Sequence, residues 1–309
     1  MPLVLLVLVA LGASCRATAP AARLPASRAA AAGTEPSPGC RGLTASAASS
    51  GPRTLTSGGR TRRFRLILPD PLPEGPLPLV LNLHGLGETP ALQQLLAGMD
   101  APARARGVAV VYPEGVGLSW NAGTCCGRAG DEGVQDVRFL RELVSELGLE
   151  LCLDRRRVYA TGMSNGGMMS YRLACEAGDV FAAIAPVAAV EVVRSCAPRR
   201  PVPVLAFNGT SDPLVPWEGG HFGLSAPAES LARWSARDGC GPARPVYARG
   251  DVRCEAAQAC RADVLSCRVE GGGHTWPGGM EAFFLGHTTS DLDATATILD
   301  FFLDHPRGD

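Results

Sequence analysis

The chain has 309 residues, with 29 Lys and Arg against 30 Asp and Glu, and a formal net charge of −1. A surface that binds nucleic-acid phosphates needs a basic excess, so this charge balance argues against a nucleic-acid partner. The strong cations are all arginines, since the sequence contains no lysine.

The first 14 residues form an apolar run that ends beside Cys15. This run is too short to span a bilayer, so residues 1–15 are expected to be a secretory signal segment. Cys15 also allows a lipoprotein signal with a lipid anchor on that cysteine. A buried N-terminal helix is a third interpretation. The expected location is secreted or extracellular, with the periplasm and a lipid anchor through Cys15 as alternatives.

Residues 16–52 are rich in Ala, Pro, Ser and Gly and have almost no large apolar side chains. Such a segment buries too little surface to offset its ordering entropy, so a disordered tether is expected. The remaining residues, 53–309, have the length of a single domain.

Eleven cysteines are many for a cytosolic enzyme. Without Cys15 their number is even, which beside a signal-like segment predicts disulfides. We expect a Cys175–Cys196 bridge and pairing among the last four cysteines, Cys240, Cys254, Cys260 and Cys267. No C-x-x-C pair occurs, so no metal site is expected.

Short apolar runs alternate with helical periodicity from residue 53 onward. Residues 53–68 indicate a strand, a turn and a second strand. Further strands are expected at 79–83, 107–112, 157–160, 184–187, 204–207 and 264–269, and helices at 134–147 and 292–302. This alternation predicts an α/β domain with a mostly parallel sheet covered by helices on both faces.

The sequence ATGMSNGGMM at residues 160–169 contains a G-x-S-x-G pattern centred on Ser164. An apolar strand precedes it, and Met168, Tyr171 and Cys175 follow at helical spacing. In a nucleophile elbow this turn lifts a serine from the end of a strand onto a helix N-terminus. In a chain with 37 glycines the pattern alone is weak, so its support comes from the partners that follow.

A serine nucleophile needs a histidine base and a carboxylate that orients the base. His274 follows the 264–269 strand in a glycine-rich loop, and Asp212 follows the 204–207 strand. The chain order Ser, acid, His is the one expected after a nucleophile elbow. Glu218 is the alternative acid, and a turn-forming role is the alternative for Asp212.

The oxyanion hole is expected to use the backbone N–H groups of Leu86 and Asn165. His84 is expected to brace its loop rather than act as a second base. Trp276 and Trp120 lie in glycine-rich loops and are candidate substrate-binding side chains, although lone aromatic residues more often belong to a core.

The chain resembles the secreted polyhydroxybutyrate depolymerase and feruloyl or acetylxylan esterase group, carbohydrate-esterase family one in the broad sense. The matching stretches are LNLHGLGE (81–88), SWNAGTCCG (119–127), RRVYATGMSNGGMMSYRLACE (156–176), FAAIAPVAA (181–189), NGTSDPLVPWEGG (208–220) and EGGGHTWPGG (270–279). The resemblance implies an α/β-hydrolase fold, a Ser164-Asp212-His274 triad and a carboxylic ester substrate, with no metal or organic cofactor. Leu86 departs from the family, because many relatives have Cys there.

The function expected from the sequence is that of a secreted serine esterase acting on polyhydroxyalkanoate (hydroxybutyrate) polymer or oligomers. A feruloyl or acetylxylan esterase acting on plant cell-wall polysaccharide is the alternative. A peptidase and an inert hydrolase-fold binding protein are further alternatives, and the complete set of catalytic residue types argues against the inert one.

Overall fold

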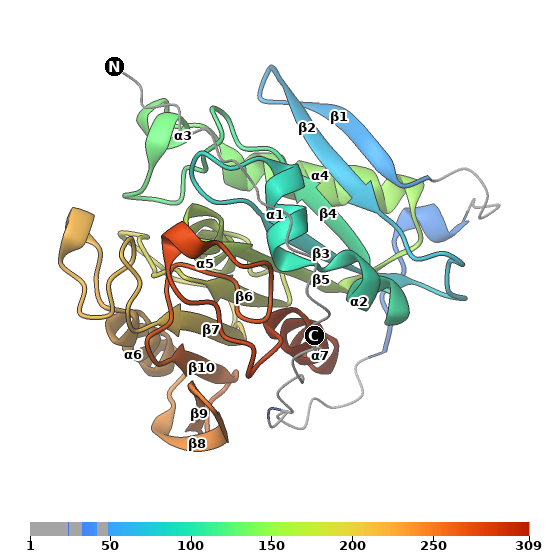
Figure 1. Cartoon of the computed structure of the whole chain (residues 1–309). Helices are drawn as coiled ribbons and strands as arrows, with labels where there is room; N and C mark the ends of the chain where they lie inside the picture. Colours follow the sequence, from blue (N-terminus) through green and yellow to red (C-terminus); the bar gives the residue numbers. More distant parts are fainter. Residues whose placement is uncertain (1–23, 25–32, 42–48, 309) are drawn as a thin grey trace.

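The computed structural model describes residue 24 and residues 33–41 and 49–308. Its centre is a ten-stranded sheet in the order β1-β2-β4-β3-β5-β6-β7-β10-β9-β8 (Figure 1). The expected signal segment, residues 1–15, and Cys15 lie outside the described residues. In the described ranges, no helix has the length and apolar character needed to cross a membrane.

The middle of the sheet is parallel and its two edges are antiparallel. The six parallel strands are β3 (Leu77–Leu83), β4 (Ala109–Pro113), β5 (Leu153–Met163), β6 (Ala183–Val187), β7 (Val204–Gly209) and β10 (Val264–Val269). The antiparallel edges are β1 (Gly51–Ser57) with β2 (Arg60–Ile67), and β8 (Gly241–Arg249) with β9 (Val252–Gln258). The predicted mostly parallel sheet is confirmed.

Helices cover both faces of the sheet, because the buried strands carry apolar side chains on either side. One core cluster includes side chains from α4 (Asp136–Glu150), α5 (Asn165–Glu176) and α6 (Pro227–Arg237). The other includes side chains from α1 (Pro90–Ala97), α2 (Asp100–Ala105) and α7 (Ala294–Asp304). The short helical elements are α3 (Gly127–Asp131), η1 (Pro38–Arg41), η2 (His221–Gly223) and η3 (Phe283–Leu285).

The segment expected to be a disordered tether, residues 16–52, has described structure over 33–41 and again over 49–52, where Gly51 begins β1. Ser37 Oγ donates to Leu151 O at 2.8 Å and accepts from Leu153 N at 2.9 Å. Cys40 is bonded to Cys152 at the start of β5. Hydrogen bonds and a covalent link replace the apolar burial that this composition lacks, so the expectation was wrong for these residues. Residues 16–23, 25–32 and 42–48 of the expected tether lie outside the described part of the chain.

Five disulfides join the ten cysteines after Cys15. The expected Cys175–Cys196 bridge is present, and the last four cysteines pair as Cys240–Cys260 and Cys254–Cys267. The other two bonds are Cys40–Cys152 and Cys125–Cys126, the latter between adjacent residues. The disulfide-linked α/β fold predicted from the sequence is confirmed.

Candidate active site

Ser164 occupies a sharp turn between β5 and α5. Its backbone has φ 54° and ψ −123°, a conformation that side-chain-bearing residues rarely adopt. The turn is closed by the Ser164 N–H donating to Val187 O at 2.9 Å, and by Met168 N donating to Ser164 O at 2.8 Å. This is the strained strand-to-helix geometry of a nucleophile elbow.

The glycines around Ser164 permit a close approach of β3 to the elbow. A Cβ added to Gly162 would lie 2.4 Å from Leu83 O, and one added to Gly166 would lie 2.1 Å from the same atom. Real Cβ atoms do not approach a backbone oxygen so closely, so both positions require glycine. The end of β3, which leads into the His84–Glu88 loop, is therefore held directly against the serine turn.

Asp212 and His274 form a buried pair at the ends of β7 and β10. His274 Nδ1 lies 2.8 Å from Asp212 Oδ2, and each residue is less than 5% exposed. The Asp212 Oδ1 atom accepts hydrogen bonds from Leu214 N and Val215 N, both at 2.8 Å. Asp212 thus carries the loop contacts and the histidine contact on different oxygens, so it combines the predicted catalytic and turn-forming contacts.

The two expected oxyanion donors are available. Within the described residues, neither Leu86 N–H nor Asn165 N–H has a hydrogen-bond acceptor. The Leu86 loop is held in place on both sides: Gly87 N donates to Leu118 O at 2.8 Å, and Glu88 N donates to Gly85 O at 3.2 Å. Unpaired N–H groups on a fixed loop are what an oxyanion hole requires.

Glu88 is a functional candidate that the sequence reasoning missed. Its Oε2 accepts the Gly85 N–H at 2.8 Å, next to the Leu86 donor. Burial raises the pKa of the Glu88 carboxyl, while the Gly85 hydrogen bond and the nearby charge of His274 lower it. The Glu88 carboxyl therefore holds the Gly85 amide in place, next to the Leu86 N–H. Its position at the end of the LNLHGLGE stretch was the available signal.

His84 braces its loop, as the sequence predicts. Its Nδ1 lies 2.8 Å from Gly85 O, and its Nε2 accepts from Gly115 N at 2.9 Å. Burial is the main cause that lowers the pKa of His84 to about 4, so the ring is neutral near pH 7. Both ring nitrogens are already engaged, which leaves neither free to serve as a second base.

The expected substrate-binding tryptophans are interior residues in the structure. Trp120 is 0% exposed and Trp276 is 1% exposed. The Trp120 indole N–H donates to His84 O at 2.9 Å, and the Trp276 indole N–H donates to Thr295 Oγ1 at 2.9 Å. Their polar atoms are satisfied and their rings pack in the core, so the expectation of a substrate-facing role is corrected.

Trp120 instead connects the Ser164 turn to its neighbouring loop. Asn165 Oδ1 accepts from Trp120 N at 2.6 Å, and Asn165 Nδ2 donates to Trp120 O at 3.0 Å. The side chain of Asn165 thus clamps a backbone segment, in addition to the backbone N–H for which the residue was singled out. Sequence reasoning did not detect this side-chain role.

A buried ion pair also supports the 119–127 loop, which contains Trp120. Arg62 Nη2 donates to Asp136 Oδ1 at 2.8 Å, and both side chains are at most 4% exposed. The other carboxylate oxygen of Asp136 accepts from Asn121 N at 2.9 Å. The 119–127 loop is therefore anchored to β2 and α4.

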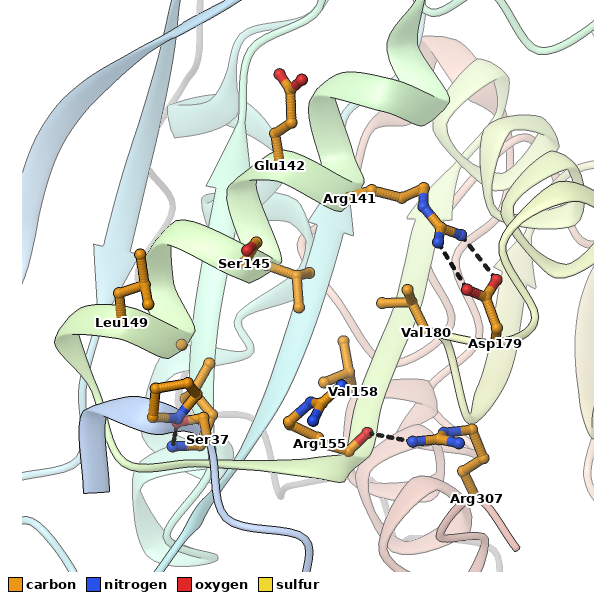
Figure 2. Close-up of a pocket in the computed structure, with 14 residues that line it drawn as sticks. Ser37, Arg141, Glu142, Ser145, Leu149, Arg155, Val158, Asp179, Val180 and Arg307 are labelled. Carbon is orange, nitrogen blue, oxygen red and sulfur yellow. Dashed lines mark hydrogen bonds and ion pairs between the residues drawn. The ribbon is translucent and has the colours of Figure 1, made fainter. Parts of the chain in front are cut away.

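A separate cavity lies away from the Ser164 turn. It measures about 540 Å³ and lies beside α4, the start of β5 and the 33–41 segment (Figure 2). The charged groups at this cavity are already paired: Arg141 bonds Asp179 through two contacts of 2.7 and 2.6 Å, and Arg307 bonds Glu35 at 2.8 Å. Since Arg155 lines the cavity and Ser164 follows the far end of the same strand, the two sites are on the order of 30 Å apart.

Comparisons with known proteins agree with this architecture. Residues 98–200 match the model of the prolyl oligopeptidase family, about a third of the chain. The acetyl xylan esterase from Aspergillus awamori superposes with a TM-score of 0.60 at 14% identity, covering 82% of this chain and 99% of that one. At this identity the likeness shows the fold, which is that of the α/β-hydrolases.

Two relatives by sequence are named as esterases. "Putative esterase NocK" of Nocardia uniformis subsp. tsuyamanensis is 35% identical over 282 residues, covering 81% of this chain and 82% of the relative. Feruloyl esterase B of Piromyces equi is 32% identical over 216 residues, covering 64% of this chain but only 39% of the relative. The chain therefore belongs to this family of α/β-hydrolase esterases and is a carboxylic ester hydrolase.

Proposed function

We propose that Ser164, Asp212 and His274 are the catalytic triad of this esterase. The observation that carries the proposal is the buried His274–Asp212 bond of 2.8 Å between the loops that follow β10 and β7. Parallel strands present their carboxyl ends at one edge of the sheet, and Ser164 follows β5 at that same edge. The chain order and the strained serine turn support the same assignment.

In the proposed reaction, His274 takes the Ser164 hydroxyl proton as the serine oxygen attacks the ester carbonyl. The Leu86 and Asn165 N–H groups hold the negative oxygen of the tetrahedral intermediate. His274 gives the proton to the departing alcohol, which leaves an acyl-serine. Water then attacks with His274 again as base, releasing the carboxylic acid and restoring the serine.

The substrate class we propose is a feruloyl-type ester of plant cell-wall polysaccharide. Its support is the sequence similarity to feruloyl esterases, among them feruloyl esterase B of Piromyces equi. Polyhydroxyalkanoate oligomers are the second candidate, favoured by the motif resemblance over the stretches between residues 81 and 279. Acetylated xylan is a variant of the first candidate. Each of these substrates is hydrolysed at an ester carbonyl by the same steps.

We also propose that the protein functions in an oxidising compartment outside the cytoplasm. The five disulfides of the described chain support this proposal, because reducing compartments do not maintain such bonds. Secretion, a periplasmic location and a lipid anchor at Cys15 are the alternatives within it. Mass spectrometry of the mature N-terminus would distinguish them.

The triad is tested by Ser164→Ala in an assay with a p-nitrophenyl acyl ester. We expect kcat to fall by several powers of ten, since triad members act as a unit. A fluorophosphonate should label the natural enzyme and leave the variant unlabelled. Near-normal turnover by the variant would refute the assignment, and an unlabelled natural protein would support an inert hydrolase-fold binding protein instead.

The substrate class is tested by a panel of methyl ferulate, a hydroxybutyrate oligomer and acetylated xylooligosaccharide. The feruloyl proposal requires the highest kcat/KM on methyl ferulate. A matched amide added to the panel tests peptidase activity, which should be low by comparison.

A further inference from the structure

Exposed apolar side chains gather on the loops that carry the proposed catalytic groups. Among the described residues, six large apolar side chains are exposed: Leu86, Leu95, Leu149, Leu214, Phe283 and Phe284. Leu86 belongs to the oxyanion loop, Leu214 lies two residues after Asp212, and the two phenylalanines form η3 in the segment after His274. Single exposed apolar residues are normal, but a group on neighbouring functional loops marks a ligand site.

The two phenylalanines are the most exposed members of this group, at 84% for Phe283 and 62% for Phe284. Their neighbours are held inward, because Ala282 is 8% exposed and Leu285 packs against the core. Leu285 N donates to Ala282 O at 2.7 Å, which closes the turn between these anchors. The turn therefore presents two phenyl rings to solvent from a fixed base.

This turn is bonded directly to the backbone of the proposed catalytic base. His274 N donates to Leu285 O at 2.7 Å. A Cβ added to Gly273 would lie 2.1 Å from the same Leu285 oxygen, so glycine is needed for the two segments to approach. With 3.8 Å between successive Cα atoms, the Phe284 Cα lies within about 9 Å of the His274 amide nitrogen.

We propose that Phe283 and Phe284 bind the aromatic ring of an aryl acyl ester while its carbonyl lies against Ser164. This inference rests on the proposed feruloyl-type substrate and names the residues that select it. Aromatic rings pack against one another with a preference that aliphatic groups do not match. Leu86 contributes an apolar side chain beside the oxyanion donor, where the part of the acyl group nearest the carbonyl would lie.

The proposal is tested with the double variant Phe283→Ala/Phe284→Ala and two esters of different acyl group, methyl ferulate and ethyl acetate. We expect kcat/KM for methyl ferulate to fall about tenfold, corresponding to about 1.4 kcal/mol, chiefly through a higher KM. Hydrolysis of ethyl acetate should change less than twofold, since its acyl group is too small to reach the turn. Leu149→Ala is the matched control, because Leu149 on α4 is 58% exposed, close to Phe284, and its replacement should leave both rates unchanged.

A second double variant, Phe283→Leu/Phe284→Leu, separates aromatic contact from general apolar contact. If it retains the methyl ferulate activity in full, aromatic recognition is overturned. Equal loss on both esters after the alanine substitutions would also overturn the proposal, because it would reveal damage to the His274 loop. The alanine double variant could instead lose hydrolysis of a hydroxybutyrate trimer while its hydrolysis of methyl ferulate is unaffected. That result would overturn the proposal in favour of polyester binding.

The wild-type protein separates this inference from the proposed function. If it hydrolyses neither ester, the proposed function itself fails. A second outcome is that the wild-type protein hydrolyses methyl ferulate and ethyl acetate, and the alanine double variant hydrolyses each ester at the wild-type rate. In that case the proposed function stands and only the role of the two phenylalanines is rejected.

Discussion

Asp212 binds His274 with one carboxylate oxygen and its own loop with the other. Oδ2 lies 2.8 Å from His274 Nδ1, while Oδ1 accepts the N–H groups of Leu214 and Val215. An aspartate used in this way has its rotamer fixed before substrate arrives. The arrangement also determines what an amide in its place would do.

Asp212→Asn is expected to lower kcat by about 10⁴-fold. The two loop N–H groups require an oxygen acceptor, so the asparagine NH2 would face His274 and oppose the tautomer that the base needs. The measurement is steady-state hydrolysis of a p-nitrophenyl ester. Glu218→Gln is the control, because Glu218 was the alternative acid and is exposed. Glu218→Gln should leave kcat unchanged. If instead Glu218→Gln loses activity and Asp212→Asn retains it, Glu218 is the acid.

Glu88→Ala is expected to lower kcat, because the Gly85 N–H beside the proposed oxyanion donor loses its carboxylate acceptor. Glu88→Gln should retain most of the activity, since the glutamine amide oxygen can still accept that N–H. Steady-state hydrolysis of a p-nitrophenyl ester by the two variants tests this. Equal and large losses in both would show that the charge of Glu88, and not only its contact with Gly85, is needed.

His84 is expected to make the fold less stable in mild acid. Burial lowers its pKa from 6.5 to about 4 in the folded protein. Between these values the unfolded chain binds the proton and the folded chain does not, so stability falls as pH drops through this window. The loss approaches roughly 3 kcal/mol between pH 7 and pH 4.

Denaturant unfolding at several pH values measures this loss, with His84→Gln as the comparison. The variant should show a shallower fall in unfolding free energy than the natural protein. Asp238 acts in the opposite direction, because burial raises its pKa to about 6, and it is present in both proteins. Parallel pH dependences for the two proteins would contradict the buried neutral state of His84.

Removing the Cys40–Cys152 bond should destabilise the protein without impairing catalysis. The bond joins cysteines 112 positions apart in sequence, and closing a long loop restricts the unfolded chain. The double variant Cys40→Ala/Cys152→Ala is expected to lose roughly 2–4 kcal/mol of unfolding free energy. Its kcat should be unchanged, since the bond lies at the opposite end of β5 from Ser164. A large loss of kcat in a fully folded variant would argue against this separation.

The sequence was sufficient to place the residues whose position follows from strand ends. Ser164, Asp212 and His274 each follow a short apolar run, and such runs in an α/β chain become parallel strands with their carboxyl ends together. Local patterns and the resemblance therefore predicted the fold class and located the candidate triad.

Burial and long-range partners could not be predicted in the same way. Trp120 and Trp276 lie in glycine-rich loops, and only the packing of distant helices and strands places their rings inside. The sequence analysis did not predict the edge strand β8, because its residues are largely exposed and include Pro242 and Pro245. Prolines are tolerated in an edge strand but not in a central one, so they do not exclude a strand here. The order of residues 33–41 depends on Cys152, more than a hundred residues away.

Glu35 forms ion pairs with Arg155 at 3.0 Å and with Arg307 at 2.8 Å. Glu35 and Arg307, which lie near the two ends of the described domain, therefore meet beside Arg155 at the start of β5. This proximity suits circular permutation, because a short linker from Arg307 to Glu35 would close the chain. New termini at the Gly58–Gly59 turn would leave Ser164, Asp212 and His274 on one uninterrupted segment. A chain that begins at a different residue should therefore still bring Ser164, Asp212 and His274 together.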